Sequence, residues 1–289
     1  MAFSGTVRVL INGTWTTLTY NSTSRAYEAQ ITAPGKTSFN EPNGVYVVTA
    51  EATNTAGTVS KATTNLHVYE TVKPVINISS PSSGAYVKNN KQPIVFTITD
   101  EVNGSGVDIS SLVVKLNGTQ ITSGIVTTAI TNGYSVTVTP PAMDDGSNTV
   151  TVDCSDNDGN AVDTKSTTFT VDTAPPILNV TSPVEGLITN NRTIVFSGST
   201  NDSTSSPVTL TVGGVSVTVN SDGTFSYSKK YSADGTYTVD IVATDSAGQT
   251  TTVSRTFTID TSAPNIRSIT ISPDPVATGK VMTVKVVVE

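Results

Sequence analysis

The sequence contains very few of the residues from which catalytic and metal centres are usually built. Among its 289 residues are one histidine, one cysteine, one tryptophan and three methionines. With only His67 and Cys154, the chain cannot form a multi-cysteine zinc site or an internal disulfide, and no reasonable geometry gives it a Ser-His-Asp or Cys-His catalytic pair. We therefore predict a non-enzymatic protein with no catalytic residue, no metal site and no cofactor.

Long apolar runs and clusters of positive charge are also missing. No segment approaches the ~20 apolar residues of a membrane span, and the first residues pass into an alternating strand without a basic and apolar leader. We expect no membrane span, and a Sec-exported precursor is disfavoured unless a leader was removed before residue 1. The formal net charge is −7, only 13% of the residues are charged, and lysine and arginine form no cluster. Binding to nucleic acid is therefore disfavoured.

Threonine and valine are abundant, with 52 and 39 copies, beside 21 glycines and 14 prolines. β-branched residues favour strands, whereas glycine and proline favour turns. Alternating runs are separated by Asn12-Gly13, Asn117-Gly118 and Asn132-Gly133, and such pairs supply the positive φ angles that tight hairpins need. About seven short strands per ~90–100 residues is the pattern of an immunoglobulin-like (Ig-like) β-sandwich.

One sequence module recurs along the chain. The segment that ends at Gly57 aligns with those that end at Gly159 and Gly248, which follow at spacings of 102 and 89 residues. Each copy continues into a strand and then a junction that carries proline, and these junctions set the module boundaries. We predict an all-β rod of tandem Ig-like sandwiches with an orphan C-terminal strand pair. The modules are expected over residues 1–72, 73–173, 174–262 and 263–289.

The junctions resemble those of a known class of repeat. Residues 171–176 (VDTAPP), 243–248 (ATDSAG) and 259–264 (IDTSAP) resemble the junction and penultimate-strand signatures of bacterial Ig-like repeats. Repeats of this class build surface stalks, adhesins and phage virion appendages. With its leaderless start and short C-terminal ending, the chain is similar in character to Ig-like structural proteins of Firmicutes prophages.

This resemblance implies a structural appendage of a phage or phage-like tail particle, located in the virion and assembled in the host cytoplasm. Copies of the chain itself or other virion structural proteins would be its partners, and host-surface glycans would be weak ligands. Two alternatives stay open, because one fold hosts many functions. One is a fragment of an extracellular bacterial cell-surface stalk or adhesin. The other is an accessory carbohydrate-binding region of a larger secreted enzyme.

The two ends of the chain differ from the complete modules. The first module lacks the two strands that open the second and third, whereas residues 263–289 consist of little else. An open sandwich exposes strand edges and apolar surface. We therefore predict strand complementation, in which this tail adds to the first module of another copy or to a different protein. The simpler alternative is a six-strand first module closed by its own loops and a tail that is merely truncated. The docking residues expected on the tail are Ile269, Ile271, Val281, Met282, Val284, Val286 and Val288.

The longest loop of the first module, residues 35–44, is the first choice for a ligand surface, because binding residues gather on long loops. Lys36, Phe39 and Asn40 lie in this loop, and Trp15 follows the first hairpin turn. Exposed aromatic side chains can stack on sugars or anchor a protein partner. For Trp15 and Tyr27, however, the favoured interpretation is a place in the core of the first module.

Asp156 and Asp158, with neighbouring asparagines, form an oxygen-rich loop of the kind that calcium prefers. Asp100, Glu101 and Asp172 are the residues that a module junction could bring near it. The equivalent loops of the other modules have fewer carboxylates. Turns whose side chains bond the backbone are therefore favoured over a calcium site.

Three further positions are interpreted as structural. Asp144 and Asp145 are adjacent, so their side chains diverge, and solvated turn acids are favoured over a hydrolytic pair. Cys154 stands where the other copies have alanine and is predicted to be a buried small residue. His67 lies on the polar face of an alternating strand and is predicted to face solvent.

Overall fold

The computed structural model describes residues 3–289 and folds them almost entirely into β-strands. Two short 3-10 turns, η1 (Ser38–Asn40) and η2 (Pro42–Gly44), are the only helical elements of the described chain. None of the described residues forms a helix long and apolar enough to cross a membrane. The expected all-β fold class is confirmed. The chain divides into two compact units, one up to Thr173 and the other from Ala174 onward, and each is described by itself.

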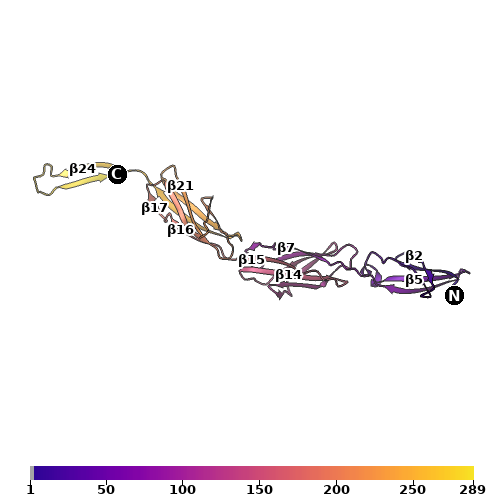
Figure 1. The fold of residues 1–289 in the computed structure, drawn as a ribbon. Helices are drawn as coiled ribbons and strands as arrows, with labels where there is room; N and C mark the ends of the chain where they lie inside the picture. Colours follow the sequence, from indigo (N-terminus) through magenta and orange to yellow (C-terminus); the bar gives the residue numbers. More distant parts are fainter. Residues whose placement is uncertain (1–2) are drawn as a thin grey trace. The chain divides into compact units, whose positions relative to one another are not determined.

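The N-terminal part of the first unit consists of one sheet and a small hairpin (Figure 1). The sheet is antiparallel with the order β2-β1-β5-β6, and the hairpin joins β3 to β4. Val9 and Tyr46 are the buried apolar side chains of residues 3–72, so the core of this module is small. The strands are β1 (Gly5–Ile11), β2 (Thr14–Thr17), β3 (Thr19–Asn21), β4 (Ala26–Glu28), β5 (Tyr46–Asn54) and β6 (Val59–Leu66).

Residues 75–171 form a sandwich of two sheets, with the orders β11-β10-β14-β15-β8 and β12-β13-β9-β7. On β14 every second side chain from Asn148 to Asp156 is buried, as the two-residue period of a strand requires. Phe96 and Phe169 lie fully buried between the sheets. The strands are β7 (Val75–Ser80), β8 (Tyr86–Val87), β9 (Ile94–Thr99), β10 (Val107–Leu116), β11 (Thr119–Gln120), β12 (Ile125–Ile130), β13 (Gly133–Val138), β14 (Gly146–Asp156) and β15 (Lys165–Val171).

The second unit repeats this plan with sheets of order β16-β18-β21 and β17-β23-β22-β19-β20. Phe196 and Phe257 fill its core, with ring centroids 6.0 Å apart in an edge-to-face arrangement. In both sandwiches a short strand pairs in parallel with the last strand, β8 with β15 and β17 with β23. The strands are β16 (Ile177–Ser182), β17 (Leu187–Thr189), β18 (Thr193–Asn201), β19 (Thr209–Val212), β20 (Val215–Val217), β21 (Thr224–Lys230), β22 (Gly235–Thr244) and β23 (Thr250–Ile259).

Two of the three Asn-Gly turns have the expected left-handed backbone. Asn12 and Asn117 have φ angles of 45° and 50°, and the glycines that follow them have 76° and 81°. The third turn is different, because Gly133 already belongs to β13. A Cβ atom there would collide with the carbonyl oxygen of Ile98 on β9. This glycine is therefore needed for close strand pairing and not for the turn.

Residues 266–288 form an antiparallel hairpin of β24 (Ile266–Ser272) and β25 (Thr283–Val288), shown in yellow near the C-terminus in Figure 1. All residues of β24 are exposed, and so are those of β25 apart from Val287, which is partly buried. Val281 and Met282, expected to lie in the second strand, precede it. The hairpin therefore has side chains open to solvent on both faces.

Candidate functional site

Two core strands of the first unit's sandwich each lead into an aspartate that keeps the inward register. On β9 the buried series that contains Phe96 continues to Asp100, and on β14 the series that contains Val152 ends at Asp156. Alternate residues of a strand face the same side, so both carboxylates lie beneath the surface, with Asp100 7% and Asp156 2% exposed. Asp156 pairs with Val107, which starts the strand after the Asp100 loop. Both aspartates therefore lie at one end of the sandwich.

Glu70 reaches this end of the sandwich from the first module. It lies between β6 and β7, and β7 begins opposite Thr99, the residue before Asp100. Its main chain is fixed on both sides: the N–H donates to Asp158 Oδ2 at 3.0 Å, and the carbonyl accepts from Asn160 Nδ2 at 3.1 Å. The junction between the first and second modules is thus tied to the loop after β14.

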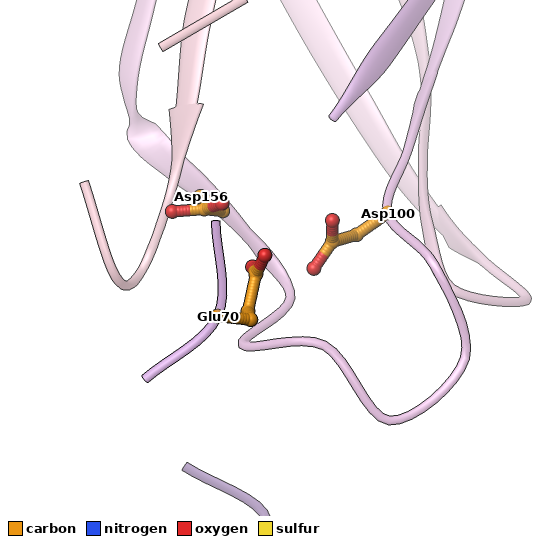
Figure 2. A group of neighbouring side chains, drawn as sticks. All are labelled: Glu70, Asp100 and Asp156. Atoms are coloured by element: carbon orange, nitrogen blue, oxygen red, sulfur yellow. The ribbon is translucent and has the colours of Figure 1, made fainter. Parts of the chain in front are cut away.

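Figure 2 shows the carboxylates of Glu70, Asp100 and Asp156 turned toward one another. One oxygen from each lies within 4.8 Å of the other two. Both oxygens of Asp156 accept from Asn160, Oδ1 from its N–H and Oδ2 from its Nδ2, each at 2.8 Å. Asp100 Oδ2 accepts from the Gly106 N–H at 2.7 Å. The loop therefore holds these acids in place with hydrogen bonds from neutral groups.

Several oxygens of this group have weak partners or none. Glu70 Oε1 accepts from Ser105 Oγ at 3.3 Å, and its Oε2 accepts from the Val72 N–H at 2.6 Å. Asp100 Oδ1 and Glu101 Oε2 are buried without any hydrogen-bond partner. Across residues 3–289, none of the ion pairs involves these acidic residues. The group therefore has an excess of negative charge.

Burial and repulsion from neighbouring carboxylates raise the pKa values of Glu70 and Glu101. Burial raises the pKa of Glu70, and the carboxylate of Asp156 beside it raises that pKa further. Burial also raises the pKa of Glu101 to about 7, with the neighbouring Asp100 as the next cause. Such a group either keeps protons near neutral pH or binds a cation. Its all-oxygen donor set suits a hard divalent ion better than zinc.

The sequence expectation for this group is partly correct. Asp100 and Asp156 come together, and Asp156 makes the expected bond to the Asn160 backbone. Asp172 does not join them. It follows β15, whose last residue pairs with Gly146 at the start of β14, so Asp172 lies at the opposite end of the sandwich.

Glu70 was missed by the sequence reasoning. It stands 30 residues before Asp100 and 86 before Asp156, and nothing in its own segment marks a ligand. The signal that could have found Glu70 is its position in the module. Glu70 stands just before the proline-containing junction that follows the first module, as Asp172 stands just before the junction that follows the second. Asp158, which the sequence did single out, accepts from the Glu70 main chain instead.

The long loop at residues 35–44 contacts the second module. Asn40 Nδ2 donates to the carbonyls of Gly104 and Asn103, at 2.9 and 3.2 Å. Lys36 is exposed, and the ring of Phe39 is 54% exposed. Of the loop residues expected to bind a ligand, Lys36 and Phe39 are accessible, whereas the amide of Asn40 is engaged at the junction.

Trp15 is not a core residue, contrary to the favoured interpretation. Its side chain on β2 is 38% exposed, and the Arg8 guanidinium lies 4.2 Å from its ring centroid. Tyr27 is also outside a core: it packs on Tyr20 with ring centroids 5.3 Å apart and donates to the Phe3 carbonyl. The physical reason is that residues 3–72 form one four-stranded sheet and only the two-stranded hairpin β3-β4 beside it, which is too small to bury these rings.

The docking residues expected on the tail are all exposed, and five of them lie on the strands of the hairpin, whereas Val281 and Met282 precede β25. Ile269 pairs with Val286, and Ile271 pairs with Val284. A row of apolar side chains on an unpaired strand edge is suited to adding a further strand. The exposed fractions are 60% for Ile269, 46% for Ile271, 89% for Val281, 49% for Met282, 52% for Val284, 47% for Val286 and 53% for Val288.

The three structural interpretations agree with the structure. Asp145 accepts from the N–H and the hydroxyl of Thr173, each at 3.0 Å, and Asp144 is an exposed loop residue. Cys154 is 4% exposed and unpaired, and burial raises the pKa of its thiol, which makes it unreactive. His67 is exposed just beyond the end of β6.

An open groove of about 730 Å³ lies at the end of this sandwich opposite the carboxylate group. Asn117, Asp144 and Asn148 supply polar groups to it, and none of its lining residues is aromatic. Sugar recognition commonly relies on stacking against aromatic faces. The groove therefore adds no support for glycan binding.

Two family profiles match parts of the chain. Residues 74–152 match the family described as Bacterial Ig domain, and residues 176–261 match the family described as Glucodextranase, domain B. The chain therefore contains Ig-like repeat domains, as its junction sequences indicated. The match to each profile falls on one of the complete sandwiches.

Among characterised proteins, the chain is similar to chitinase ChiA of Flavobacterium johnsoniae, with 31% identity over 211 residues. This match covers 67% of the chain and only 13% of the chitinase. Among solved structures, the chain is similar to fibronectin(III)-like modules of CbhA from Clostridium thermocellum. That similarity has 21% identity and a TM-score of 0.42, and covers 64% of this chain and 94% of the other.

A chain from a 1.5-MDa bacterial ice-binding adhesin is also similar, with 23% identity and a TM-score of 0.30 over 90% of this chain and 86% of the other. Both structural similarities are distant. The fold assignment therefore rests on the strand order and register of the two sandwiches.

Proposed function

We propose that the chain is a non-catalytic spacer region of a larger protein at the cell surface or outside the cell. The observation that supports this most directly is the junction at residues 67–74. Ser38 donates its N–H to the Val68 carbonyl at 2.7 Å, and Glu70 is bonded to Asp158 and Asn160 of the next module. A short connection hydrogen-bonded to the modules on both sides leaves little slack, which is what a spacer requires.

The match of residues 74–152 to the family described as Bacterial Ig domain supports the extracellular location, the alternative that the sequence left open. Modules of this fold carry many functions, so the spacer role depends on the tandem arrangement and the braced junction. The phage-tail role, with its virion partners, rests on the sequence resemblance and stays a prediction. Strand addition by the tail also stays a prediction.

A second candidate is an accessory region of an enzyme that acts on a polysaccharide. It is favoured by the similarity to a chitinase over 211 residues and by the match to the family described as Glucodextranase, domain B. Both names denote enzymes that act on a glycan. In this role the chain would itself bind the polysaccharide and so bring a separate catalytic domain to it.

Two measurements test these functions. For a spacer, small-angle X-ray scattering should give a radius of gyration clearly larger than the ~19 Å of a compact chain of this length, and a value near that figure would contradict the proposal. Co-sedimentation with insoluble chitin tests the second candidate. A spacer stays in the supernatant, whereas an accessory carbohydrate-binding region moves to the pellet. Bovine serum albumin serves as the non-binding control.

A further inference from the structure

We propose that Glu70, Asp100 and Asp156 bind a calcium ion at the junction between the first and second modules. The three carboxylates converge from the junction segment, from the end of β9 and from the end of β14 (Figure 2). Their facing oxygens lie within 4.8 Å of one another. Two oxygens that share one calcium ion at about 2.3–2.6 Å lie at most about 5 Å apart, so this spacing suits a common ion.

An orphaned oxygen in the group points independently to a ligand. Asp100 is more than nine-tenths buried and is turned into the group, yet its Oδ1 has no hydrogen-bond partner. A buried carboxylate oxygen without a partner is costly, and the neighbouring Glu101 adds a second one in its Oε2. A cation held by the three converging carboxylates would satisfy the Asp100 oxygen. Lys36 lines a hollow with Glu70 and Glu101 but forms no ion pair with either among the described contacts.

The donor chemistry favours calcium over other metals. All donors are carboxylate oxygens, and no histidine or cysteine belongs to the group. Calcium accepts six to eight oxygen ligands in flexible geometry, whereas magnesium demands a near-ideal octahedron and retains several waters. Three or four carboxylates in a partly open junction are typical of the weaker class of calcium sites in extracellular modules, with dissociation constants of about 10⁻⁴–10⁻³ M.

The second unit repeats the aspartate pair. Asp202 and Asp245 follow its equivalent core strands β18 and β22 and are 9% and 6% exposed. Asp245 Oδ1 accepts from the Gln249 N–H at 2.8 Å, as Asp156 does from Asn160, and Asp245 Oδ2 is buried without a partner. Each sandwich therefore leaves a buried aspartate oxygen without a partner at this end, on Asp100 in the first unit and on Asp245, the counterpart of Asp156, in the second.

The first module supplies a natural neutral version of the same turn. Asn54 occupies the position of Asp156, and its Oδ1 accepts from the N–H groups of Ala56 and Thr58, at 2.9 and 2.8 Å. An asparagine therefore closes this turn without a negative charge. Asp156→Asn should fold for the same reason, which makes it a suitable test of the calcium site.

Calorimetric titration of CaCl₂ into the full chain, after dialysis against EDTA, tests the proposal. We expect saturable binding that weakens by roughly tenfold or more in Asp156→Asn and in Glu70→Gln, because ligand charge sets affinity in such sites. Asp144→Asn, which removes an exposed carboxylate elsewhere in the same module, should leave the isotherm unchanged. Asp245→Asn is measured in parallel to separate any ion bound by the second unit.

Absence of calcium binding to the wild-type chain at up to 10 times the expected dissociation constant overturns the proposal. So does a wild-type isotherm in both Asp156→Asn and Glu70→Gln. A second readout is proteolysis of the junction at residues 67–74, which should slow in calcium for the wild type and not for these variants. The proposal does not rest on the spacer function, because the scattering and co-sedimentation outcomes are independent of calcium affinity.

Discussion

At the scale of single residues, buried carboxylates have different surroundings on the sheet of the first module and at the module junction. On the sheet a buried carboxylate is paired with cations, whereas the carboxylate group at the module junction has no cation partner among the described residues. Glu51 on β5 is 4% exposed and stands opposite Arg8 of β1 on one side and Lys61 of β6 on the other. Arg8 donates from Nε to Glu51 Oε1 at 2.8 Å, and Lys61 Nζ lies 3.0 Å from Oε2. The buried carboxylate is thus neutralised twice, in contrast to Asp100, which has no cation beside it.

This pairing predicts how the first module responds to acid. The Lys61 ammonium beside Glu51, together with Arg8, holds the pKa of that carboxyl below its ordinary value of 4.5. Because the folded pKa is the lower one, the stabilisation is fully present above pH 4.5 and is lost as the pH falls through the folded pKa. Glu51→Gln should therefore melt at a lower temperature than wild type at pH 7, and the difference should close toward pH 3.

Thermal unfolding followed by circular dichroism between pH 3 and pH 7 measures this difference. The double variant Arg8→Gln, Lys61→Gln is the matched control, because it removes both cations and should flatten the same part of the pH profile. The difference in melting temperature between wild type and Glu51→Gln could instead stay constant down to pH 3. That result would show that the ion pairs of Glu51 are not its cause.

At the scale of elements, the turns were largely predictable and the junction was not. Asn12-Gly13 and Asn117-Gly118 predict hairpins, because tight hairpin turns need positive φ angles and few other residues adopt them. The prediction of such a turn depends only on two adjacent residues. The carboxylate group depends on Glu70, which reaches Asp100 only through the pairing of β7 with β9. No period or spacing within the sequence encodes that meeting.

The position of Trp15 failed to follow from the sequence for a related reason. Alternation places an aromatic residue on one face of a strand, but whether that face is buried depends on a second sheet. In residues 3–72 the described strands form only one sheet and a hairpin, so Arg8 covers the ring instead. Cys154 was predictable because the other copies have alanine at its position, and the second sheet of its sandwich buries it.

The turn between β10 and β11 gives a prediction for one glycine. Gly118 has a φ of 81°, and a Cβ atom there would meet nothing within 4 Å. Gly118→Ala should therefore lower the free energy of unfolding by ~1 kcal/mol through backbone strain alone. Gly35 is the matched control, because it has no left-handed φ and also has open space around it. Urea unfolding should give a lower midpoint than wild type for Gly118→Ala and an unchanged midpoint for Gly35→Ala. Equal midpoints in the two variants would contradict the strain argument.

The C-terminal hairpin gives a second prediction at this scale. An isolated two-stranded hairpin is marginally stable in water, and the directly paired Ile269–Val286 and Ile271–Val284 expose a row of apolar side chains on one face. If the hairpin adds to a sheet edge of a second copy, light scattering coupled to size exclusion should find a concentration-dependent oligomer for the full chain and a monomer for a chain that ends at Asp260. Monomers in both cases would exclude addition between copies. Ser268→Lys, on the exposed β24, is a control that keeps the hairpin length.

At the scale of the whole molecule, the described residues contain two large and separate hydrophobic cores beside the small core of the first module. One surrounds Phe96 in the first unit, and the other surrounds Phe196 in the second. Apolar burial is the main stabilising contribution to folding, and the two cores share no residue. Repeat proteins whose units hold separate cores gain stability from each unit and from its interface with the next.

Equivalent core truncations should therefore act on different unfolding transitions. Phe96 and Phe196 are both 0% exposed, and replacing a buried phenylalanine with alanine costs ~3–5 kcal/mol through lost transfer energy and the cavity that remains. For sandwiches of this size that cost lowers a melting temperature by more than ~10 °C.

Differential scanning calorimetry should show one transition shifted in Phe96→Ala and the other transition shifted in Phe196→Ala. The control is Val126→Ala, whose side chain is 62% exposed and whose stability should stay within about 0.5 kcal/mol of wild type. A single transition that moves by the same amount in both core variants would mean that the two units unfold together, and a spacer built from independently stable modules would then be excluded.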